Sequence, residues 1–188
     1  MKSDLYKSIK ITLVFCVFLS FFVLILLGVA HTFSPNKGNV EVVTLNGKIV
    51  GADNVGQTFK KDIYFWGRPS AANYQGDAGT GSNKGPTNAA YLKDVKGRID
   101  TFIINHPYLK RSDVPAEMVT ASASGLDPDI TPASAYVQVK RVAKARGMNE
   151  EAVRAIVDKQ IEKPLLGVFG PAKINVLKLN VALDKVKK

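Results

Sequence analysis

The chain has 188 residues, a net charge of +10 at neutral pH and a single cysteine. Because that cysteine, Cys16, lies in an apolar run, the rest of the chain is expected to hold no disulfide and no thiol nucleophile. The two histidines are far apart in the sequence, which argues against a histidine-based metal site. The basic excess fits an acidic partner surface, anionic headgroups or nucleic acid, and equally a basic surface that faces solvent.

Residues 11–30 form a run of twenty residues without a charge. At about 1.5 Å of rise per residue, a helix of this length matches the ~30 Å hydrocarbon core of a bilayer, so the run predicts one transmembrane helix. Three lysines precede the run, and the first lysine beyond it is Lys37. The positive-inside rule therefore predicts a cytoplasmic N-terminus at residues 1–10 and an extracytoplasmic domain at residues 31–188.

A cleaved signal peptide is the alternative interpretation of this segment, because Gly28 and Ala30 are small enough for a cleavage site. The apolar stretch of a signal peptide is typically ~7–15 residues, and the longer run here favours a permanent anchor. Either interpretation places the remaining chain outside the cytoplasm.

Small or hydroxyl-bearing residues recur at multiples of four positions along this segment. They are Ser8, Thr12, Cys16, Ser20 and Gly28. Because small side chains let two helices approach closely in lipid, the stripe predicts a packing face for a partner's transmembrane helix or for a second copy of the chain. No residue of the run is ionisable at neutral pH, so the helix alone is not expected to carry ions.

Three features precede the first helix expected in the outer domain. Residues 40–51 predict a β-hairpin whose turn is Asn46-Gly47. Residues 64–66 place three aromatic side chains ahead of Arg68, and this cluster favours a buried core over a binding hot spot. The glycine-rich residues 73–88 lack the Lys-Ser/Thr pair of a phosphate-binding loop at the required place, and so predict a loop that contacts a partner.

A helix is expected from about Asn88 to Asn105, because apolar residues recur there at helical spacing. The His106-Pro107 pair ends it, since the residue before a proline disfavours the helical conformation. At that position His106 is expected to act as a partner of the helix dipole rather than as a catalyst.

Four polar residues lie close together in the segment 118–132, which has neither helical nor strand periodicity. They are Ser122, Ser124, Asp127 and Asp129. A serine hydrolase is not expected, because the segment has no G-x-S-x-G motif and both histidines precede it. The two aspartates lack the further oxygen ligands of an EF-hand. We therefore predict neither a catalytic residue nor a metal ligand in this chain.

Two further helices are expected beyond Thr131, which is placed to N-cap the first of them. Gly147 ends that helix, and Asn149 caps the next one, which ends before Pro164. The residues expected to face inward are Ala135, Val139, Val142, Ala143, Ala152, Val153, Ile156 and Val157, and those expected to face outward are Lys140, Arg141 and Lys144.

The short connection between these two helices resembles a DNA-reading helix-turn-helix, so a membrane-anchored nucleic-acid-binding protein is the alternative function. The second helix opens with Glu150 and Glu151, which would repel phosphates where a recognition helix meets the bases. The charge asymmetry around the membrane segment also places the domain away from cytoplasmic DNA. Nucleic acid is therefore not expected as a partner.

The chain closes with a strict apolar alternation from Leu177 to Leu183, which predicts a half-buried strand. Ile174 and Val176 are in the opposite phase, which indicates a bulge near Leu177. The expected fold class is therefore α+β, with one N-terminal transmembrane helix followed by a compact mixed α/β extracytoplasmic domain.

Sequence blocks along the whole chain resemble one protein family. They are residues 49–51 and 55–57, Gly67-Arg68-Pro69-Ser70-Ala71, Gly81-Ser82-Asn83, and residues 119–127, 130–132, 141–146 and 175–184. The T-A-S-A-S-G-L-D and R-V-A-K-A-R blocks, in this order behind one membrane span, are the most specific. On these residues the chain resembles the KdpC family, the C subunits of bacterial Kdp potassium-transporting P-type ATPases.

The resemblance implies a non-catalytic subunit of a high-affinity, ATP-driven potassium uptake complex in the bacterial inner membrane. Its partners would be a K⁺-channel-like pore subunit and the P-type ATPase subunit that hydrolyses ATP. The chain would help to assemble these two and would act as a catalytic chaperone that raises the ATP affinity of the pump subunit. It would bind no cofactor alone, while the complex handles ATP and K⁺.

The resemblance also suggests Gln57 as a nucleotide contact. Together with the residue patterns, it makes six residues candidate contacts with partner subunits, namely Arg68, Ser82, Asn83, Ser122, Ser124 and Asp127. We hypothesise that Arg68 and Asp127 either hold the loops of the domain together or pin the domain to the pore subunit.

Overall fold

The structure, a computed structural model, describes residues 2–34 and 36–186 and divides into two compact units on either side of the Glu41–Val42 bond. Unit 1 contains one helix, α1 (Lys2–Phe33). Unit 2, which begins at Val42, is a domain of mixed helices and short strands. The chain therefore has the α+β fold with one N-terminal apolar helix that the sequence predicts.

Helix α1 extends beyond both ends of the apolar run at residues 11–30. Its segment Ser3–Phe33 is long and apolar enough to cross a membrane, with a mean hydropathy of 3.0 in its most apolar window. None of that window is buried by other parts of the structure. An apolar helix without protein cover needs lipid or other helices around it, which fits a membrane anchor.

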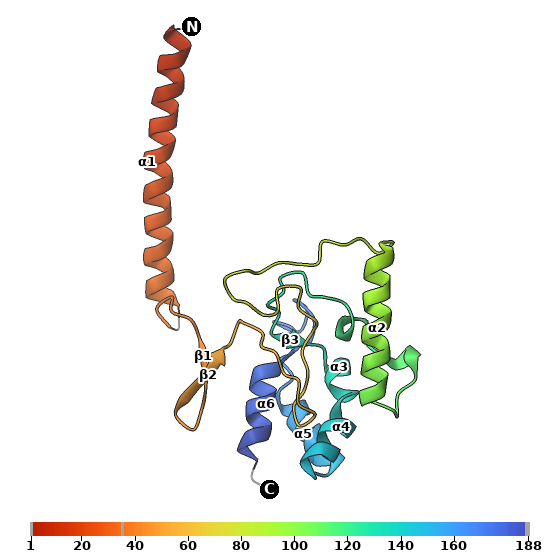
Figure 1. The fold of residues 1–188 in the computed structure, drawn as a ribbon. Helices are drawn as coiled ribbons and strands as arrows, with labels where there is room; N and C mark the ends of the chain where they lie inside the picture. The colour runs from red at the N-terminus through yellow and green to blue at the C-terminus, as the bar shows by residue number, and fades with distance from the viewer. Residues whose placement is uncertain (1, 35, 187–188) are drawn as a thin grey trace. The chain divides into compact units, whose positions relative to one another are not determined.

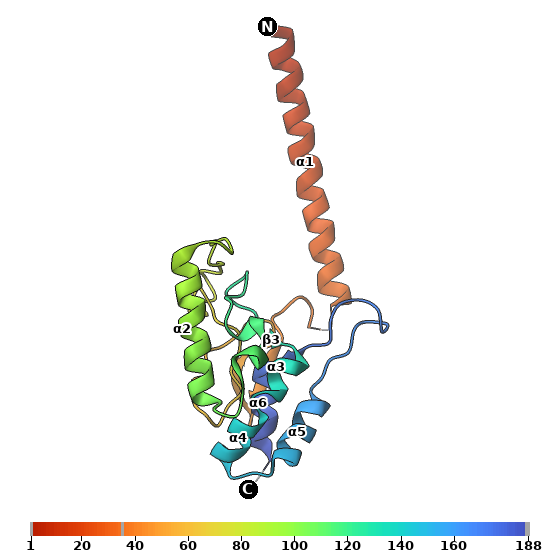
Figure 2. The ribbon, with the colours of Figure 1, turned by 90° about the vertical axis from the view of Figure 1, so that its right-hand side faces the viewer.

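In chain order, the elements of unit 2 are β1 (Val42–Leu45), β2 (Lys48–Ala52), α2 (Ala89–Asn105), the 3-10 turns η1 (Arg111–Asp113) and η2 (Ala116–Met118), β3 (Asp129–Ile130), α3 (Pro132–Tyr136), α4 (Val139–Arg146), α5 (Glu150–Lys159), β4 (Ile174–Asn175) and α6 (Val176–Lys185). The strands form two separate antiparallel pairs, β1 with β2 and β3 with β4. In Figures 1 and 2, α2 lies along one side of this unit, and α4, α5 and α6 gather together.

Because both sheets are small, the core of unit 2 is made mainly by helices and by the aromatic segment around Phe65. Its buried members are Phe65, Phe102, Met118, Ile130, Ala135, Val139, Val142, Ala143, Val153, Val157, Ile174, Val176, Leu179 and Leu183. Of the aromatic run at residues 64–66 that is predicted to belong to the core, Phe65 is fully buried and Trp66 packs partly buried against the core, while Tyr64 is only half-buried.

The local signals of the hairpin and of α2 are confirmed. Asn46 and Gly47 have φ of 52° and 75°, the left-handed pair that a two-residue hairpin turn requires. Helix α2 starts at the predicted N-cap, where the Asn88 side chain accepts a hydrogen bond from the Tyr91 amide at 3.0 Å.

The helix predicted from Thr131 to Gly147 is divided into α3 and α4. Thr131 caps α3, and its Oγ1 accepts from the Ser134 amide at 3.2 Å. The division falls at Gln138, whose side-chain amide is buried. Its Oε1 accepts from the Trp66 amide at 2.8 Å, and its Nε2 donates to the Trp66 carbonyl at 3.2 Å. This amide pairs with a distant extended segment, so helical periodicity alone carries no sign of the break.

Helices α4 and α5 otherwise follow the sequence pattern. Gly147 ends α4 with φ of 64°, and the side chain of Asn149 accepts from the Glu151 amide at 2.8 Å. The inward positions on α3 and α4 are buried as predicted, and so are Val153 and Val157 on α5. Ala152 is exposed, so its predicted inward position is wrong, because the apolar stripe of α5 is narrower than expected.

The predicted strand from Leu177 to Leu183, with its bulge, is wrong: these residues belong to helix α6. The helix begins where the Asn175 side chain accepts from the Lys178 amide at 3.0 Å. Its buried residues are Val176, Leu177, Leu179, Asn180, Val181 and Leu183. Because protein surrounds most of α6, the apolar face of the helix is wide. This face includes every second residue from Leu177 to Leu183, and so produces the alternation that is typical of a strand.

Arg141 lies in the core rather than on the outward face predicted for it, and only 6% of its side chain is exposed. Its Nε–H donates to Nε2 of His106 at 2.9 Å, and its Nη groups donate to the carbonyls of Asp62 and Tyr64 at 2.7–3.1 Å. The guanidinium also stacks on Trp66, 4.0 Å from the ring centroid. These partners come from a distant segment, and they make burial of the charge tolerable.

His106 is buried at the C-cap of α2, where its ring bonds a carbonyl of the last helical turn as predicted, but it does so as a neutral group rather than as a cation. Its Nδ1–H donates to the Phe102 carbonyl at 2.8 Å, a tautomer assigned from the network because Nε2 must accept from Arg141. Burial lowers the pKa of His106 to about 4, the Phe102 hydrogen bond partly opposes this, and the nearby Arg141 charge lowers the pKa further.

The depressed pKa of His106 predicts a pH-dependent stability. Between about 4 and the ordinary value of 6.5, the unfolded chain binds a proton that the folded chain does not. The free energy of unfolding should therefore fall as pH drops through this range, by at most about 3.5 kcal/mol at ~1.4 kcal/mol per pKa unit. Urea unfolding at a series of pH values measures the slope. A His106→Gln variant should give a flatter profile, and parallel profiles for the two proteins would contradict the assignment.

Candidate functional site

Arg68 and Asp127 bring two loops of unit 2 together. Nη1 of Arg68 lies 2.9 Å from Oδ2 of Asp127, and the two side chains are 25% and 28% exposed. Oδ1 of Asp127 also accepts from the Asp129 amide at 3.1 Å, which fixes the turn into β3. This ion pair supports the hypothesis that Arg68 and Asp127 hold the loops of the domain together.

The serines of these loops stabilise turns through hydrogen bonds to the backbone. Oγ of Ser70 donates to the Gly125 carbonyl at 2.6 Å, and Oγ of Ser122 accepts from the Gly125 amide at 2.9 Å. Oγ of Ser124 accepts from the Leu126 amide at 3.1 Å. Among the described residues, neither Ser122 nor Ser124 has a histidine hydrogen-bonded to it.

The glycine-rich loop packs against the same turn. A Cβ on Gly81 would lie 2.8 Å from the Ala123 carbonyl oxygen, and one on Gly125 would lie 2.6 Å from the Thr80 carbonyl oxygen. Backbone therefore meets backbone here at a distance that only glycine allows. Ser82 is half-buried and Asn83 is exposed with φ of 51°, so both stand next to this contact.

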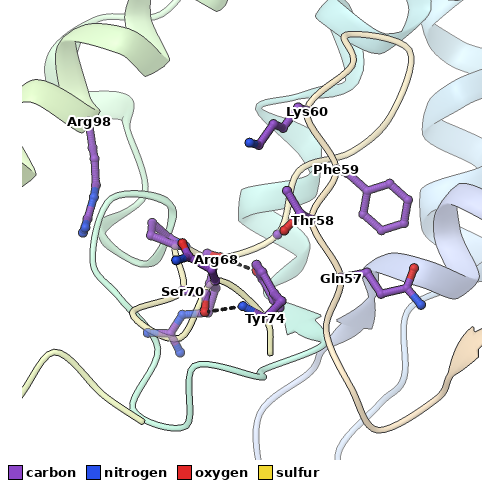
Figure 3. Close-up of a pocket in the computed structure, with 11 residues that line it drawn as sticks. Gln57, Thr58, Phe59, Lys60, Arg68, Ser70, Tyr74 and Arg98 are labelled. Atoms are coloured by element: carbon purple, nitrogen blue, oxygen red, sulfur yellow. Dashed lines mark hydrogen bonds between the residues drawn. The ribbon is translucent and has the colours of Figure 1, made fainter. Parts of the chain in front are cut away.

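A pocket of about 590 Å³ is lined in part by Arg68 (Figure 3). Its lining residues are Gln57, Thr58, Phe59, Lys60, Gly67, Arg68, Pro69, Ser70, Asn73, Tyr74 and Arg98. The lining includes three cations and no carboxylate, and we call it the cationic pocket. It combines three segments that are distant in sequence: residues 57–60, residues 67–74 and one side chain from α2.

The cations of the cationic pocket keep unused hydrogen-bonding capacity. Nε of Arg68 is buried without a partner among the described residues. Arg98 donates from Nη1 to the Val119 carbonyl at 3.1 Å, and Lys60 is exposed. Within residues 2–34 and 36–186, neither Lys60 nor Arg98 is within ion-pair distance of a carboxylate. The pocket is therefore suited to a carboxylate or another anion.

Tyr74 forms the wall of the cationic pocket. Its hydroxyl donates a short hydrogen bond to the Arg68 carbonyl, and its amide donates to Oγ of Ser70 at 3.0 Å (Figure 3). Burial raises the pKa of Tyr74 to about 12, and the nearby Asp127 charge adds to this effect. The tyrosine therefore stays protonated and keeps the backbone at Arg68 in place.

Gln57 lies at the edge of the cationic pocket with its amide turned away from Arg68 and Ser70 (Figure 3). Its Nε2 donates to the Val50 carbonyl at 3.0 Å. A Cβ on Gly51 would lie 1.8 Å from that nitrogen, so the glycine makes room for the amide. The side chain thus joins β2 to the segment that follows it, and its Oε1 accepts no hydrogen bond from the residues that the structure describes.

The hydroxyls of the small-residue stripe on α1 are satisfied within the helix. Ser8, Thr12 and Ser20 each donate to the carbonyl four residues earlier, at 2.8–2.9 Å. A further hydroxyl below the stripe, that of Thr32, donates to the carbonyl of Gly28 at 2.7 Å. With their hydroxyls bonded to the backbone, these residues present small surfaces to lipid or to another helix.

Sequence reasoning did not find Lys60, Tyr74 and Arg98. The block Gly67-Arg68-Pro69-Ser70 points to one wall of the cationic pocket, but nothing in the spacing of Lys60 or Arg98 places them opposite it. These residues meet only through the fold.

The sequence of the chain matches a known protein family over most of its length. The family model described as KdpC, the K⁺-transporting ATPase c chain, matches residues 5–185. The chain belongs to the KdpC family. A potassium-transporting ATPase KdpC subunit of Bacteroides fragilis is 69% identical over 186 residues, which cover 97% of each chain.

The KdpC family likeness extends to more distant bacteria at nearly full length. The KdpC subunit of Flavobacterium johnsoniae is 48% identical over 98% of this chain and 99% of its own. That of Caldanaerobacter subterraneus is 41% identical over 100% of this chain and 98% of its own. The match thus includes both the apolar helix α1 and all of unit 2, and neither part is an addition peculiar to this chain.

Proposed function

We propose that this chain is the non-catalytic C subunit of an ATP-driven potassium uptake complex and acts by binding its partner subunits. The full-length match to proteins named as KdpC subunits carries the proposal. The loops around the cationic pocket support it, since they are built from structural hydrogen bonds rather than from a nucleophile and a base. The partners are the channel-like pore subunit and the P-type ATPase subunit.

The test of this proposal is purification through a tag on this chain. We expect two large membrane subunits to co-purify with it, and we expect cells that lack the chain to yield neither an intact complex nor K⁺-stimulated ATP hydrolysis. ATP turnover by the purified chain alone, or recovery of an active complex without it, would contradict the proposal.

We place unit 2 on the extracytoplasmic side of the bacterial inner membrane, because three lysines of α1 precede its apolar run at residues 11–30 and no lysine follows that run before Lys37. A topology reporter fused after unit 2 tests this orientation. The same reporter separates the proposal from the helix-turn-helix alternative, since DNA binding needs a cytoplasmic domain. The exposed Glu150 and Glu151 at the start of α5 also disfavour DNA binding there.

The cationic pocket is the part of unit 2 that we assign to partner binding. Lys60, Arg68 and Arg98 offer charge-assisted hydrogen bonds, and a carboxylate from the extracytoplasmic face of a partner subunit would complete them. The ion pair with Asp127 orients the guanidinium of Arg68. Ser82, Asn83 and Ser124 are further candidate contacts near the turn at Gly125, while Ser122 is only 2% exposed and stabilises that turn through its bond to the Gly125 amide.

We also propose that the chain raises the ATP affinity of the pump subunit and that Gln57 contributes to this effect. Its Oε1 is free to accept a hydrogen bond, whereas its nitrogen is engaged by Val50. Losing one such bond costs ~0.5–1.5 kcal/mol, so Gln57→Ala should raise the KM for ATP of the complex by roughly 2–10-fold. Gln75→Ala, at an exposed position, is the control. An unchanged KM in the Gln57 variant would contradict this role of Gln57.

A further inference from the structure

The segment 164–171, between α5 and β4, exposes four large apolar side chains. Leu165, Leu166, Val168 and Phe169 are 70%, 82%, 75% and 64% exposed. Within the described part of unit 2, no other stretch of this length exposes as many. A cluster of this kind marks a surface that is covered in the working protein.

This apolar loop is a closed hairpin rather than a loose strand. At its base, Glu162 and Lys173 exchange two backbone hydrogen bonds of 2.8 and 3.0 Å. Near its tip, Leu165 and Phe169 exchange two more, of 3.0 and 2.9 Å, and Gly167 turns the chain with φ of 76°. The pairing holds the side chains away from the core, and in Figure 2 the loop stands off from the helices of unit 2.

The backbone of the loop is suited to an apolar medium. Besides the Leu165–Phe169 pair, the Gly167 amide donates to the Pro164 carbonyl at 2.9 Å, and the Val168 amide donates to the Leu165 carbonyl at 3.2 Å. Backbone polar groups that are paired within a segment make its transfer from water toward the apolar part of a bilayer less costly. Four amides of the tip donate within the loop, which lowers the cost of moving this backbone out of water.

The short connection to α1 keeps unit 2 near a bilayer. α1 ends at Phe33 and unit 2 begins at Val42. The connecting residues 34–41 reach at most about 28 Å when fully extended, at roughly 3.5 Å per residue. Unit 2 is therefore confined to the surface of the membrane that α1 crosses, on whichever side it lies.

The charges beside the loop also favour a phospholipid surface. Lys163 directly precedes it, and Lys159 ends α5. Within the described residues neither lysine forms an ion pair, whereas Lys173 lies 2.7 Å from Asp129. Apolar side chains flanked by unpaired lysines are typical of segments that bind anionic interfaces.

From these features we infer that the loop 164–171 inserts its apolar tip into the interfacial layer of the bilayer that α1 spans. Segments of this kind reach about 5–10 Å into the headgroup and acyl boundary. A protein partner is disfavoured, because protein interfaces carry hydrogen-bonding groups around an apolar centre, and residues 165–169 have no polar side chain. The loop gives unit 2 a second attachment to the membrane and so limits its orientation.

The experiment uses the full chain without partner subunits, in nanodiscs of phosphatidylcholine and phosphatidylglycerol. The only cysteine, Cys16, is replaced by serine, and a polarity-sensitive fluorophore is attached to Leu166→Cys. Ile104→Cys, on α2 and 76% exposed, is the matched control. We expect blue-shifted emission at position 166 and quenching by lipid that carries a doxyl group near the headgroup, with neither effect at position 104.

A second variant separates apolar insertion from general adsorption. Val168→Ser with Phe169→Ser keeps the hairpin but removes apolar surface, and it should reduce the quenching at position 166. Solvent-like emission at position 166, equal quenching at both positions, or quenching that survives the serine substitutions would overturn the inference. Because no partner is present, these results are independent of the subunit function proposed above.

Discussion

Replacing Arg141 by alanine is expected to lower the free energy of unfolding of unit 2 by about 3–5 kcal/mol. The substitution leaves the carbonyls of Asp62 and Tyr64 and Nε2 of His106 without their buried donor. It also removes the cation from the face of Trp66. Small domains are stable by only ~5–15 kcal/mol, so this loss is enough to leave much of the protein unfolded.

Urea unfolding followed by the fluorescence of the single tryptophan measures the effect of Arg141→Ala. Lys140→Ala, at the exposed neighbouring position, is the matched control and should change the stability by less than about 1 kcal/mol. Arg141→Lys should recover only part of the loss, since an ammonium cannot reproduce the planar fork of donors. Equal stability of the Arg141→Ala and Lys140→Ala proteins would show that the buried network contributes little.

Replacing Gly125 by alanine should destabilise unit 2 by about 2–4 kcal/mol. Gly125 has φ of 70°, and its Cβ would lie 2.6 Å from the Thr80 carbonyl oxygen and 2.9 Å from Cβ of Ala72. Two neighbouring loops would have to move apart to relieve this contact. Because Ser70 and Ser122 both bond to Gly125, the movement would reach the cationic pocket.

The comparison for this prediction is Gly76→Ala in the same glycine-rich loop. A Cβ at Gly76 meets no atom within 4 Å, so that variant should unfold like the wild type. Hydrogen exchange adds a local measurement, since the amides of Gly125 and Ser122 should lose protection in Gly125→Ala. Wild-type stability together with unchanged exchange at both amides would show that the loops do not depend on this contact.

The elements that the sequence predicts correctly are those with local causes. The Asn46-Gly47 turn, the Asn88 cap of α2 and the Thr131 cap of α3 each depend on residues within a few positions. The anchor helix α1 follows from length and hydropathy alone. None of these features needs information on what the rest of the chain contacts.

The elements that the sequence predicts wrongly are decided by distant contacts. In α6, burial on most sides makes apolar positions so frequent that an alternating subset is mistaken for a strand. Asn180 shows the cause, because its buried side chain bonds both the amide and the carbonyl of Phe65, at 2.8 and 3.0 Å. Arg141 is similar, since only the fold brings carbonyls to its guanidinium.

The candidate site is intermediate between these cases. The motif that contains Arg68 and the motif that contains Asp127 are both visible in the sequence, and their ion pair makes the two motifs one structure. The cationic pocket as a whole is not visible, because Lys60 and Arg98 come from segments without any motif. The charge of the pocket depends on which segments the fold brings together, whereas the composition gives only the net charge of the whole chain.

The most direct test of the account is charge reversal inside the cationic pocket in the assembled complex. Lys60→Glu with Arg98→Glu reverses two cations that have no ion pair among the described residues, and it leaves the Arg68–Asp127 pair intact. Lys93→Glu with Lys96→Glu makes the same charge change at exposed positions of α2, outside the pocket. Each complex is purified through a tag on this chain, and its K⁺-stimulated ATP hydrolysis is measured.

We predict that the pocket variant loses at least about tenfold in the recovery of partner subunits, equivalent to ~1.4 kcal/mol of binding, while the α2 variant keeps both recovery and activity. Equal recovery and equal ATP hydrolysis in the two variants would contradict the claim that unit 2 acts by binding a partner through this pocket.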